Sequence, residues 1–159
     1  MLPSRYICQA RTGLGTDTNS PLTWANVPTG TAGFVLLMST VAIEAGGPTT
    51  KYNWVLYSIP PSATGIPEQN TVITSGNTGT TQVGTPGLTS DGPLYSYSPP
   101  CSAAGSGLRT YTFTIYAVSA APVFSFNHTP GGGGDGANLA ASLAGITLAR
   151  SSIAGSYVF

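Results

Sequence analysis

Glycine and proline recur along this chain at intervals too short for long helices. The sequence holds 21 glycines and 13 prolines among its 159 residues. Both residue types interrupt helices and mark turns, so the pattern favours many short strands over a helical bundle. A hydrophobic fraction of 41% supplies enough apolar side chains for one core. We therefore expect a single, mainly β domain over residues 1–159.

The clearest strand signal is the segment RTYTFTIYAV, residues 109–118. Its odd positions and its even positions form two distinct rows, and a period of two is typical of a β-strand. The apolar runs GFVLLM (33–38) and YNWVLYSI (52–59) predict two buried strands. These three segments are the expected centre of the sheet.

Helical spacing occurs only near the C-terminus. Leu139, Leu143 and Ile146 recur at three- and four-residue intervals, which predicts a helix near residues 137–150. Gly155 is expected to end this region before a short closing strand, SYVF.

Charged residues are scarce and balanced, with five basic and five acidic side chains. The chain therefore lacks the basic field that attracts nucleic acid or anionic membranes, and we expect neither partner. The longest apolar run is too short to span a bilayer, and MLPSRYICQ does not resemble a signal peptide. A polar surface so poor in charge favours an extracellular location over a cytoplasmic one.

No cofactor or metal site is expected from the residue inventory. The chain has one histidine, His128, and two cysteines, and its acids are scattered. The glycine run at 131–134 is not followed by the Lys-Ser/Thr pair of a phosphate-binding loop. His128 is expected to be a loop histidine rather than a member of a catalytic triad.

Seven short motifs occur in a fixed order along nearly the whole chain. They are LPSRYIC (2–8), NSPLTWANVPTGT (19–31), FVLLM (34–38), NWVLYSIPP (53–61), IPE (66–68), SPPC (98–101) and GSGLRTYTFTIYA (105–117). Together they resemble the phosphatidylethanolamine-binding protein (PEBP) family, in particular its bacterial and fungal branch. The resemblance implies a large antiparallel sheet packed on a smaller one, peripheral helices, and a small anion pocket at one end of the sheet. The family's usual first strand, before LPSRY, is not apparent.

The departures from the family gather at the positions of that pocket. Ser39, Thr40 and Ala42 stand where the family has acids, Asn53 replaces a histidine before Trp54, and Arg109 replaces a histidine two residues before Tyr111. A guanidinium is always charged and offers several donors. The alternative is that Arg109 is an ordinary solvated strand end.

The resemblance implies a remodelled pocket beneath the 98–107 loop. Lys51, Tyr52 and Trp54 are expected to form one of its walls, and Tyr95 and Tyr97 to add aromatic surface. The expected ligand-binding residues are Glu44, Tyr52, Asn53, Trp54, Pro99, Pro100, Cys101, Gly107, Arg109 and Tyr111.

The two cysteines fall in motifs of the family-like pattern, Cys8 in LPSRYIC and Cys101 in SPPC. The sequence leaves open whether they form a disulfide. A free Cys101 beside Arg109 would be a reactive thiolate, whereas the alternative is an inert cysteine.

Three functions fit these features. The first is a module that binds a small amphipathic or carbonyl-containing ligand. The second is a cofactor-independent enzyme for a cyclisation, isomerisation or pericyclic step, with Arg109, Tyr111 and Asn53 as catalytic residues. The third is a structural domain that self-assembles, for example as a homodimer, through an unpaired strand edge. We place ligand binding first.

Overall fold

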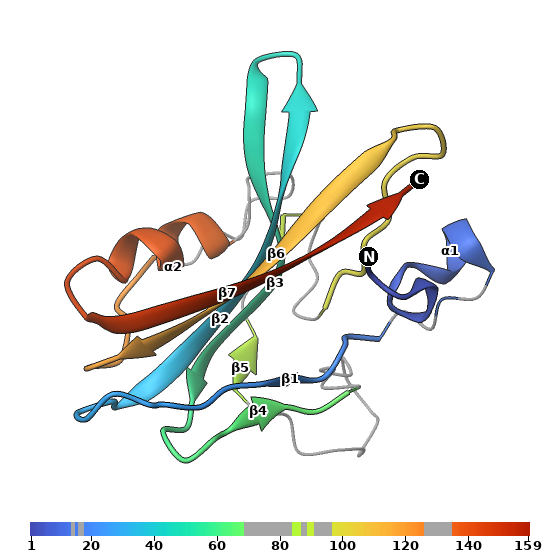
Figure 1. The fold of residues 1–159 in the computed structure, drawn as a ribbon. Coiled ribbons are helices and arrows are strands. Elements are labelled where there is room, and N and C mark those ends of the chain that lie inside the picture. The colour runs from blue at the N-terminus through green and yellow to red at the C-terminus, as the bar shows by residue number, and fades with distance from the viewer. Residues whose placement is uncertain (14, 16–17, 69–83, 87–88, 91–96, 126–134) are drawn as a thin grey trace, which may run out of the picture.

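The computed structural model describes the chain except for residues 14, 16–17, 69–83, 87–88, 91–96 and 126–134 (Figure 1). Tyr95, His128, the glycine run at 131–134 and most of the segment 75–98 thus lie outside the described residues. The elements, in chain order, are a 3-10 helix η1 (Ser4–Tyr6), α1 (Gln9–Thr12), β1 (Leu22–Thr23), β2 (Gly33–Glu44), β3 (Gly47–Ile59), β4 (Gly65–Ile66), β5 (Thr85–Pro86), β6 (Leu108–Val118), α2 (Gly136–Ser142) and β7 (Thr147–Val158).

The strands form two antiparallel sheets. The large sheet has the order β5-β3-β2-β6-β7, and β1 pairs with β4 in a small second sheet. In Figure 1, the β1–β4 pair and α2 lie on opposite sides of the large sheet. The predicted fold class, a mainly β two-sheet structure with a helix near the C-terminus, is confirmed.

The face of the large sheet beneath β1 carries the larger apolar cluster. Trp54, Leu56, Tyr111 and Phe113 are among its buried members, and Trp24 of the segment after β1 packs against it. Tyr111 and Phe113 are alternate residues of β6, so the predicted period of two places both on this face. Burying side chains of this size contributes about 1.5–3 kcal/mol each, and this cluster is therefore a main source of stability.

The opposite face of the sheet packs against α2. Val35, Leu37 and Val55 point to this side and contact Leu139 and Leu143. Alternate residues of β2 thus divide between the two clusters, which explains why GFVLLM is continuously apolar: both faces of this central strand are covered.

The helix is shorter than the sequence predicts, and the closing strand is longer. α2 ends at Ser142 instead of near residue 150, and β7 starts at Thr147 instead of at Ser156. Pairing explains the difference, because β7 runs alongside the whole of β6 from Thr147 to Val158. Gly155 accordingly lies within the strand and does not precede it. Long-range pairing overrides the weak helical periodicity here.

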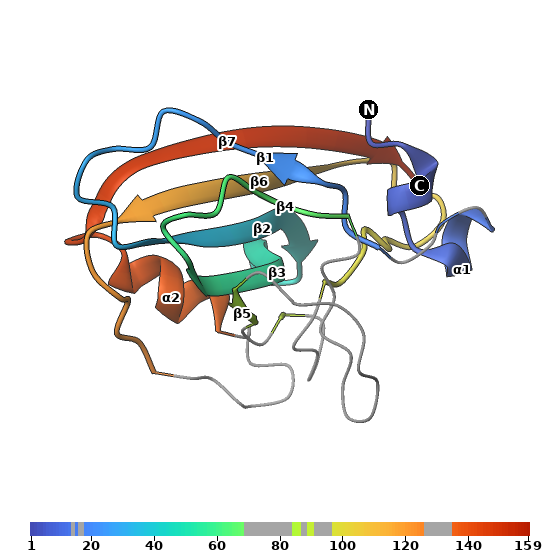
Figure 2. The ribbon, with the colours of Figure 1, turned by 90° about the horizontal axis from the view of Figure 1, so that it is seen from below.

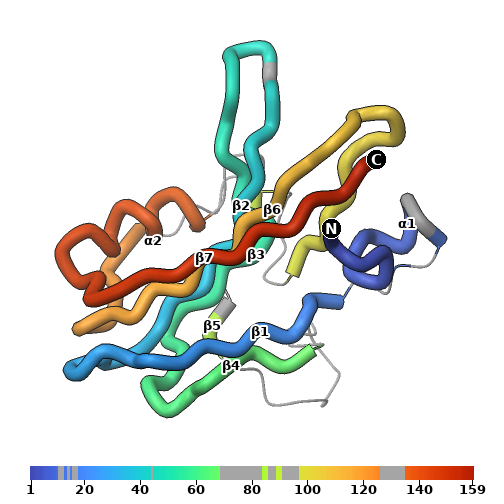
Figure 3. The backbone as a smooth tube through the Cα atoms, viewed as in Figure 1, coloured from blue at the N-terminus to red at the C-terminus, as the bar shows by residue number. Residues whose placement is uncertain are grey.

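Strands β2 and β3 extend well beyond the predicted runs and form a projecting hairpin. Their pairing continues to Glu44 opposite Gly47, whereas the pairing of β2 with β6 ends at Thr40 opposite Tyr111. The hairpin therefore separates from β6, and its tip stands at the top of Figures 1 and 3. This separation opens the end of the sheet at which β6 begins. Among the described residues, no helix combines the length and apolarity needed to traverse a bilayer.

The two ends of the chain lie side by side at that same end of the sheet (Figures 1 and 2). The Leu2 amide donates to the Ser156 carbonyl at 2.8 Å, and the Phe159 amide donates to the Gly107 carbonyl at 3.2 Å. The N-terminal segment, the C-terminus and the approach to β6 are thus held together by backbone hydrogen bonds.

Candidate functional site

A bulge in β3 sets the directions of the predicted site residues Tyr52, Asn53 and Trp54. Met38 pairs with Trp54 but Ser39 pairs with Tyr52, so Asn53 is the extra residue. The bulge changes the alternation of the strand. Trp54 joins the cluster with Tyr111, whereas Tyr52 joins the cluster on the α2 side.

The sequence predicted that Tyr52 and Trp54 would form one wall of the pocket. In the structure, the two side chains instead lie on opposite faces of the sheet. The Tyr52 ring packs on Gly136 at the start of α2, where a Cβ atom would collide with the ring. Burial raises the pKa of the Tyr52 phenol, and the nearby Tyr116 raises it further. The residue lies in a packed interface rather than beside the other predicted site residues.

Asn53 and Trp54 are both buried, at 5% and 0% exposure. The Asn53 carbonyl accepts a hydrogen bond from the Ser98 amide at 2.8 Å, which fixes the start of the SPPC loop to the bulge. Trp54 makes an edge contact with Tyr97 with the ring centroids 5.3 Å apart. The predicted loop thus does pass over this end of the sheet.

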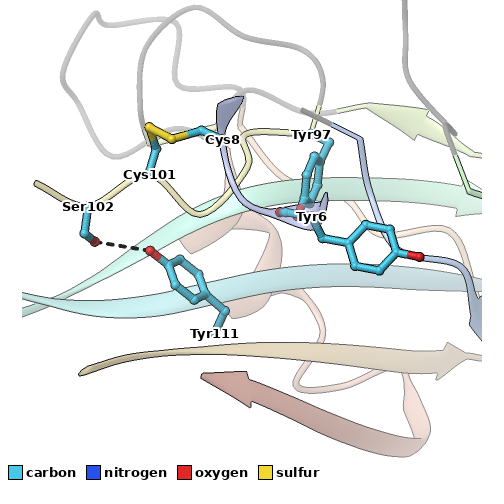
Figure 4. The surroundings of a disulfide bond; sticks show 6 residues. All are labelled: Tyr6, Cys8, Tyr97, Cys101, Ser102 and Tyr111. Atoms are coloured by element: carbon cyan, nitrogen blue, oxygen red, sulfur yellow. Dashed lines mark hydrogen bonds between the residues drawn. A yellow bond between two sulfur atoms is a disulfide. The ribbon is translucent and has the colours of Figure 1, made fainter. Parts of the chain in front are cut away.

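Tyr111 points from β6 toward the same loop (Figure 4). Its hydroxyl lies 3.2 Å from the Ser102 hydroxyl, and its side chain is 2% exposed. Ser102 was not predicted from the sequence, because a lone serine in a loop has no pattern that signals a contact with a strand.

Cys8 and Cys101 form a disulfide with their Cα atoms 5.3 Å apart. The bond settles the question that the sequence left open, and a free Cys101 thiolate is excluded in this structure. Next to it, the Cys8 amide donates to the Pro100 carbonyl at 3.0 Å. Pro100 is buried and Pro99 half-buried, so both prolines shape a loop that the disulfide fastens to the N-terminal segment.

Glycines shape the approach to β6. Gly105 and Gly107 have φ values of 78° and 76°, a region that residues with a Cβ atom rarely adopt. The Gly105 amide donates to the Phe159 carbonyl at 3.1 Å. Gly107, predicted from the family pattern, thus acts through the backbone by turning the chain into the strand.

Arg109 lies at the open end of the sheet, half-buried, on the same face of β6 as Tyr111. It lines a hollow of about 230 Å³ between β6 and the projecting hairpin. The other lining residues are Ser39, Thr40, Val41, Leu108, Thr110 and Thr112. Arg5 and Glu68 form a salt bridge, whereas Arg109 forms none with the side chains that the structure describes.

The hollow combines a cation, hydroxyls and apolar groups. Ser39 and Thr40 stand where the family pattern has acids, and they now line a cavity with a guanidinium. Val41 and Leu108 are 53% and 64% exposed and supply an apolar rim. Such a site suits an anionic group that carries a short apolar portion. Of the hairpin residues in this lining, Ser39 and Thr40 were placed at the pocket by the family pattern. Val41 was not predicted, because the length of the hairpin is not visible in the glycine-rich sequence at 44–47.

Glu44 lies at the tip of the hairpin, where its backbone pairs with Gly47. It is four residues beyond Thr40, the last residue of β2 that pairs with β6. Arg109 and Tyr111 thus lie on one strand, and Trp54 and Tyr111 pack in one cluster. Glu44 lies at the tip of the projecting hairpin.

Two buried polar atoms at this end lack a hydrogen-bond partner within the described structure. They are Nε1 of Trp54 and Oγ of Ser106, which belongs to the glycine-rich approach to β6. Buried polar atoms are nearly always paired, with protein, water or ligand. Neither residue is among those that line the hollow beside Arg109.

Comparison with known proteins gives a consistent result. The family model for phosphatidylethanolamine-binding proteins matches residues 1–158. A UPF0098 protein of Aquifex aeolicus is 30% identical over 156 residues, which cover 98% of this chain and 80% of that protein. A UPF0098 protein of Methanothermobacter thermautotrophicus is 30% identical over 118 residues, covering 74% of this chain and 68% of that protein.

Solved structures show the same fold at lower sequence identity. The E. coli protein YbcL, described as a member of the mammalian PEBP family, superposes with a TM-score of 0.74 at 18% identity, covering 100% of this chain and 91% of YbcL. A putative PEBP homologue of Chlamydia trachomatis has a TM-score of 0.71 at 21% identity, covering 98% and 87% of the two chains.

Proposed function

Because the chain belongs to the phosphatidylethanolamine-binding protein family, we propose that it binds a small amphipathic anion at the open end of its large sheet, with Arg109 as the anchor. The observation that carries this proposal is the position of Arg109. Its half-buried guanidinium lines a hollow of about 230 Å³ together with hydroxyl groups, and no described carboxylate pairs with it. A guanidinium in that position favours carboxylate, sulfonate or phosphate oxygens.

The apolar part of the ligand is assigned to the rim of the hollow. Val41 and Leu108 are exposed there and would lose contact with water when an alkyl group covers them. The hollow is small, which favours a short alkyl chain over a long lipid tail. We assign the loop of Pro99, Pro100 and Ser102 to a supporting role, since the disulfide and Tyr111 hold it in place.

Isothermal titration calorimetry with butanesulfonate tests this proposal, because the probe combines a permanent negative charge with a short alkyl chain. Inorganic sulfate and butanol serve as its two halves, and each should bind more weakly than the whole. Arg109→Ala should weaken butanesulfonate binding by about 1.5–3 kcal/mol, the contribution of hydrogen bonds to a charged group.

The matched control for this variant is Arg150→Ala, which removes an exposed arginine from β7. It should leave the affinity unchanged. Equal affinities for the wild type and the Arg109→Ala protein would refute the proposed anchor.

We also propose that the protein works in an oxidising compartment. The Cys8–Cys101 disulfide supports this location, since such bonds persist outside the reducing cytosol. Trapping free thiols with a maleimide reagent in the native cell would test it, and labelling of both cysteines would contradict it.

A further inference from the structure

The first residues of β6 have a partner strand on one side only. Strand β6 pairs with β7 along its whole length, whereas its pairing with β2 ends at Tyr111, opposite Thr40. Figure 1 shows the start of β6 diverging from the projecting hairpin. Among the described residues, no residue of β2 therefore pairs with residues 108–110. The hollow of about 230 Å³ lies on this side, so a backbone group of β6 that points here faces the hollow.

Two hydrogen bonds show which backbone groups of β6 point to the hollow. The Phe159 amide donates to the Gly107 carbonyl at 3.2 Å, so the Gly107 backbone is directed toward the β7 side. This direction alternates along an antiparallel strand, so the backbone of Arg109 also points toward β7 and that of Thr110 points away from it. The Thr40 hydroxyl agrees with this assignment, because it donates to the Thr110 carbonyl at 2.9 Å from the β2 side.

The carbonyl and the amide of Thr110 differ in what they meet on this side. The carbonyl accepts the Thr40 hydroxyl, which takes the place of the absent strand pairing. The amide points in the same direction, and the ladder of described residues places no β2 residue opposite it. Thr110 belongs to the lining of the hollow. An anion that enters the hollow thus meets the donor of this residue, while its acceptor is already engaged.

The Thr110 amide and the Arg109 side chain approach the hollow from different directions. The hydrogen-bonding groups of a strand lie in the plane of the sheet, whereas its side chains stand roughly perpendicular to that plane. The amide therefore points along the sheet toward the hairpin, and the Arg109 side chain leaves β6 on the face of Tyr111. A guanidinium can bind two oxygens of one anion in its own plane. Contact with the amide as well then requires a further oxygen outside that plane.

Sulfonates and carboxylates differ in this respect. The oxygens of a carboxylate lie in one plane with its carbon atom, whereas a sulfonate carries an additional oxygen in a tetrahedral arrangement. Given the function proposed above, on which this inference rests, we propose that the backbone amide of Thr110 is a second donor to the bound anion and makes the site prefer sulfonates to carboxylates. Arg109 binds two oxygens of the sulfonate, and the Thr110 amide binds the third. A carboxylate held by Arg109 in the same way leaves the amide to water.

Isothermal titration calorimetry with butanesulfonate and pentanoate tests this preference, because both probes carry a butyl chain and differ only in the head group. The wild type should bind butanesulfonate about 10-fold more tightly than pentanoate, the effect of one hydrogen bond to a charged group. Arg109→Ala should weaken the binding of both probes. A wild type that binds pentanoate as tightly as butanesulfonate overturns the proposal.

Thr110→Pro removes the amide hydrogen and leaves Arg109 in place. Proline is tolerated in a strand where the ladder does not use the amide, and Thr110 is such a position on the β2 side. The affinity for butanesulfonate should fall about 10-fold, and the affinity for pentanoate should fall much less. An equal loss for the two probes, or an unchanged affinity for butanesulfonate, overturns the proposal.

The matched control is Ser156→Ala. The Thr110 and Ser156 hydroxyls lie 2.8 Å apart, so this variant removes the same hydroxyl contact as Thr110→Pro but keeps the amide. Ser156 does not line the hollow, and the variant should keep the wild-type preference for butanesulfonate. Loss of the preference in Ser156→Ala would assign it to the hydroxyl contact and overturn the role of the amide.

Nuclear magnetic resonance observes the amide directly and does not require the proline variant to fold. In the free protein, the Thr110 amide should exchange with solvent faster than the Thr112 amide, because Thr112 is paired with Ser39. Saturating butanesulfonate should slow the exchange at Thr110 and shift its amide resonance, and pentanoate should do so less. A Thr110 amide that is as protected as that of Thr112 in the free protein, or that does not respond to butanesulfonate, overturns the proposal.

The two probes also separate this inference from the function on which it rests. Binding that requires Arg109 but does not involve the Thr110 amide overturns the sulfonate preference and leaves the proposed anion site intact. If the wild type binds neither probe, both proposals are wrong.

Discussion

The two ends of β6 have the same sequence pattern but different surroundings. At the inner end, Phe113, Ala117 and Val118 are 4%, 6% and 2% exposed, and apolar clusters cover both faces of the sheet. At the outer end, Leu108 is 64% exposed and Arg109 is half-buried beside a hollow. The neighbouring strand makes the difference, because β2 separates from β6 beyond Thr40.

The two ends of the strand are thus held in different ways. The inner end is held by packing on two faces. The outer end lacks such packing and is held by a disulfide, a hydroxyl contact and backbone hydrogen bonds to the chain termini. These interactions hold the outer end in position and leave the hollow beside Arg109 open.

The largest effect should come from removing the disulfide that fastens the outer end. It joins residues 93 positions apart, and opening a loop of this length should lower the free energy of unfolding by about 4–5 kcal/mol. The Cys8→Ser/Cys101→Ser double variant should show this loss in urea denaturation. Hydrogen exchange should then accelerate at residues 108–111 more than at 113–118.

The control for the double variant is reductant, which should destabilise the wild type and leave the double variant unchanged. If exchange rose equally along all of β6, the two ends would not be separately fastened.

A matched pair of truncations in β6 compares the two ends directly. Phe113→Ala should cost about 3–5 kcal/mol, because it leaves a cavity in the main cluster. Leu108→Ala should change the stability by less than about 0.5 kcal/mol, since its side chain is already in water. Thermal and urea denaturation of both variants would measure the contrast, and similar losses would show that the outer end is packed after all.

The sequence predicted the inner end of β6 well and the outer end poorly. The alternation at 109–118 and the apolar runs specify which residues are buried, because burial follows from a local period of two. The order of the motifs, together with the family resemblance, also predicted the two-sheet fold and the loop over Tyr111.

What could not be predicted depends on pairing between distant segments. The bulge at Asn53 turns Tyr52 to the face opposite Trp54, and it is set by the partner strand rather than by the residues themselves. The early start of β7 is likewise set by β6. The cavity beside Arg109 requires the separation of the hairpin from β6, which no local pattern encodes.

A smaller effect on stability is expected at Tyr111, which lies between the outer and inner ends of β6. Tyr111→Phe keeps the buried ring but removes the hydroxyl that contacts Ser102. The loss of one hydrogen bond should lower the free energy of unfolding by about 0.5–1.5 kcal/mol. Ser102→Ala should give a similar loss, and the double variant should cost less than the sum of the two. Additive losses in urea denaturation would mean that the two hydroxyls act independently.

The smallest effect on stability, but the most specific effect on binding, is expected for Arg109→His. The outer end carries little packing, so the change should alter the free energy of unfolding by no more than about 0.5 kcal/mol. In the wild type the guanidinium stays charged at all moderate pH values, and butanesulfonate affinity should therefore be constant between about pH 5.5 and 8. A histidine in its place has an ordinary pKa near 6.5, so the variant should bind the anion below about that pH and lose it above. Calorimetric titrations of both proteins across this range would measure the difference, with Arg150→His as the control that keeps the wild-type profile. A pH-independent affinity in the Arg109→His protein would show that the anion does not contact residue 109, and the open end of β6 would then have to bind its ligand through the hydroxyls of β2 and β6 alone.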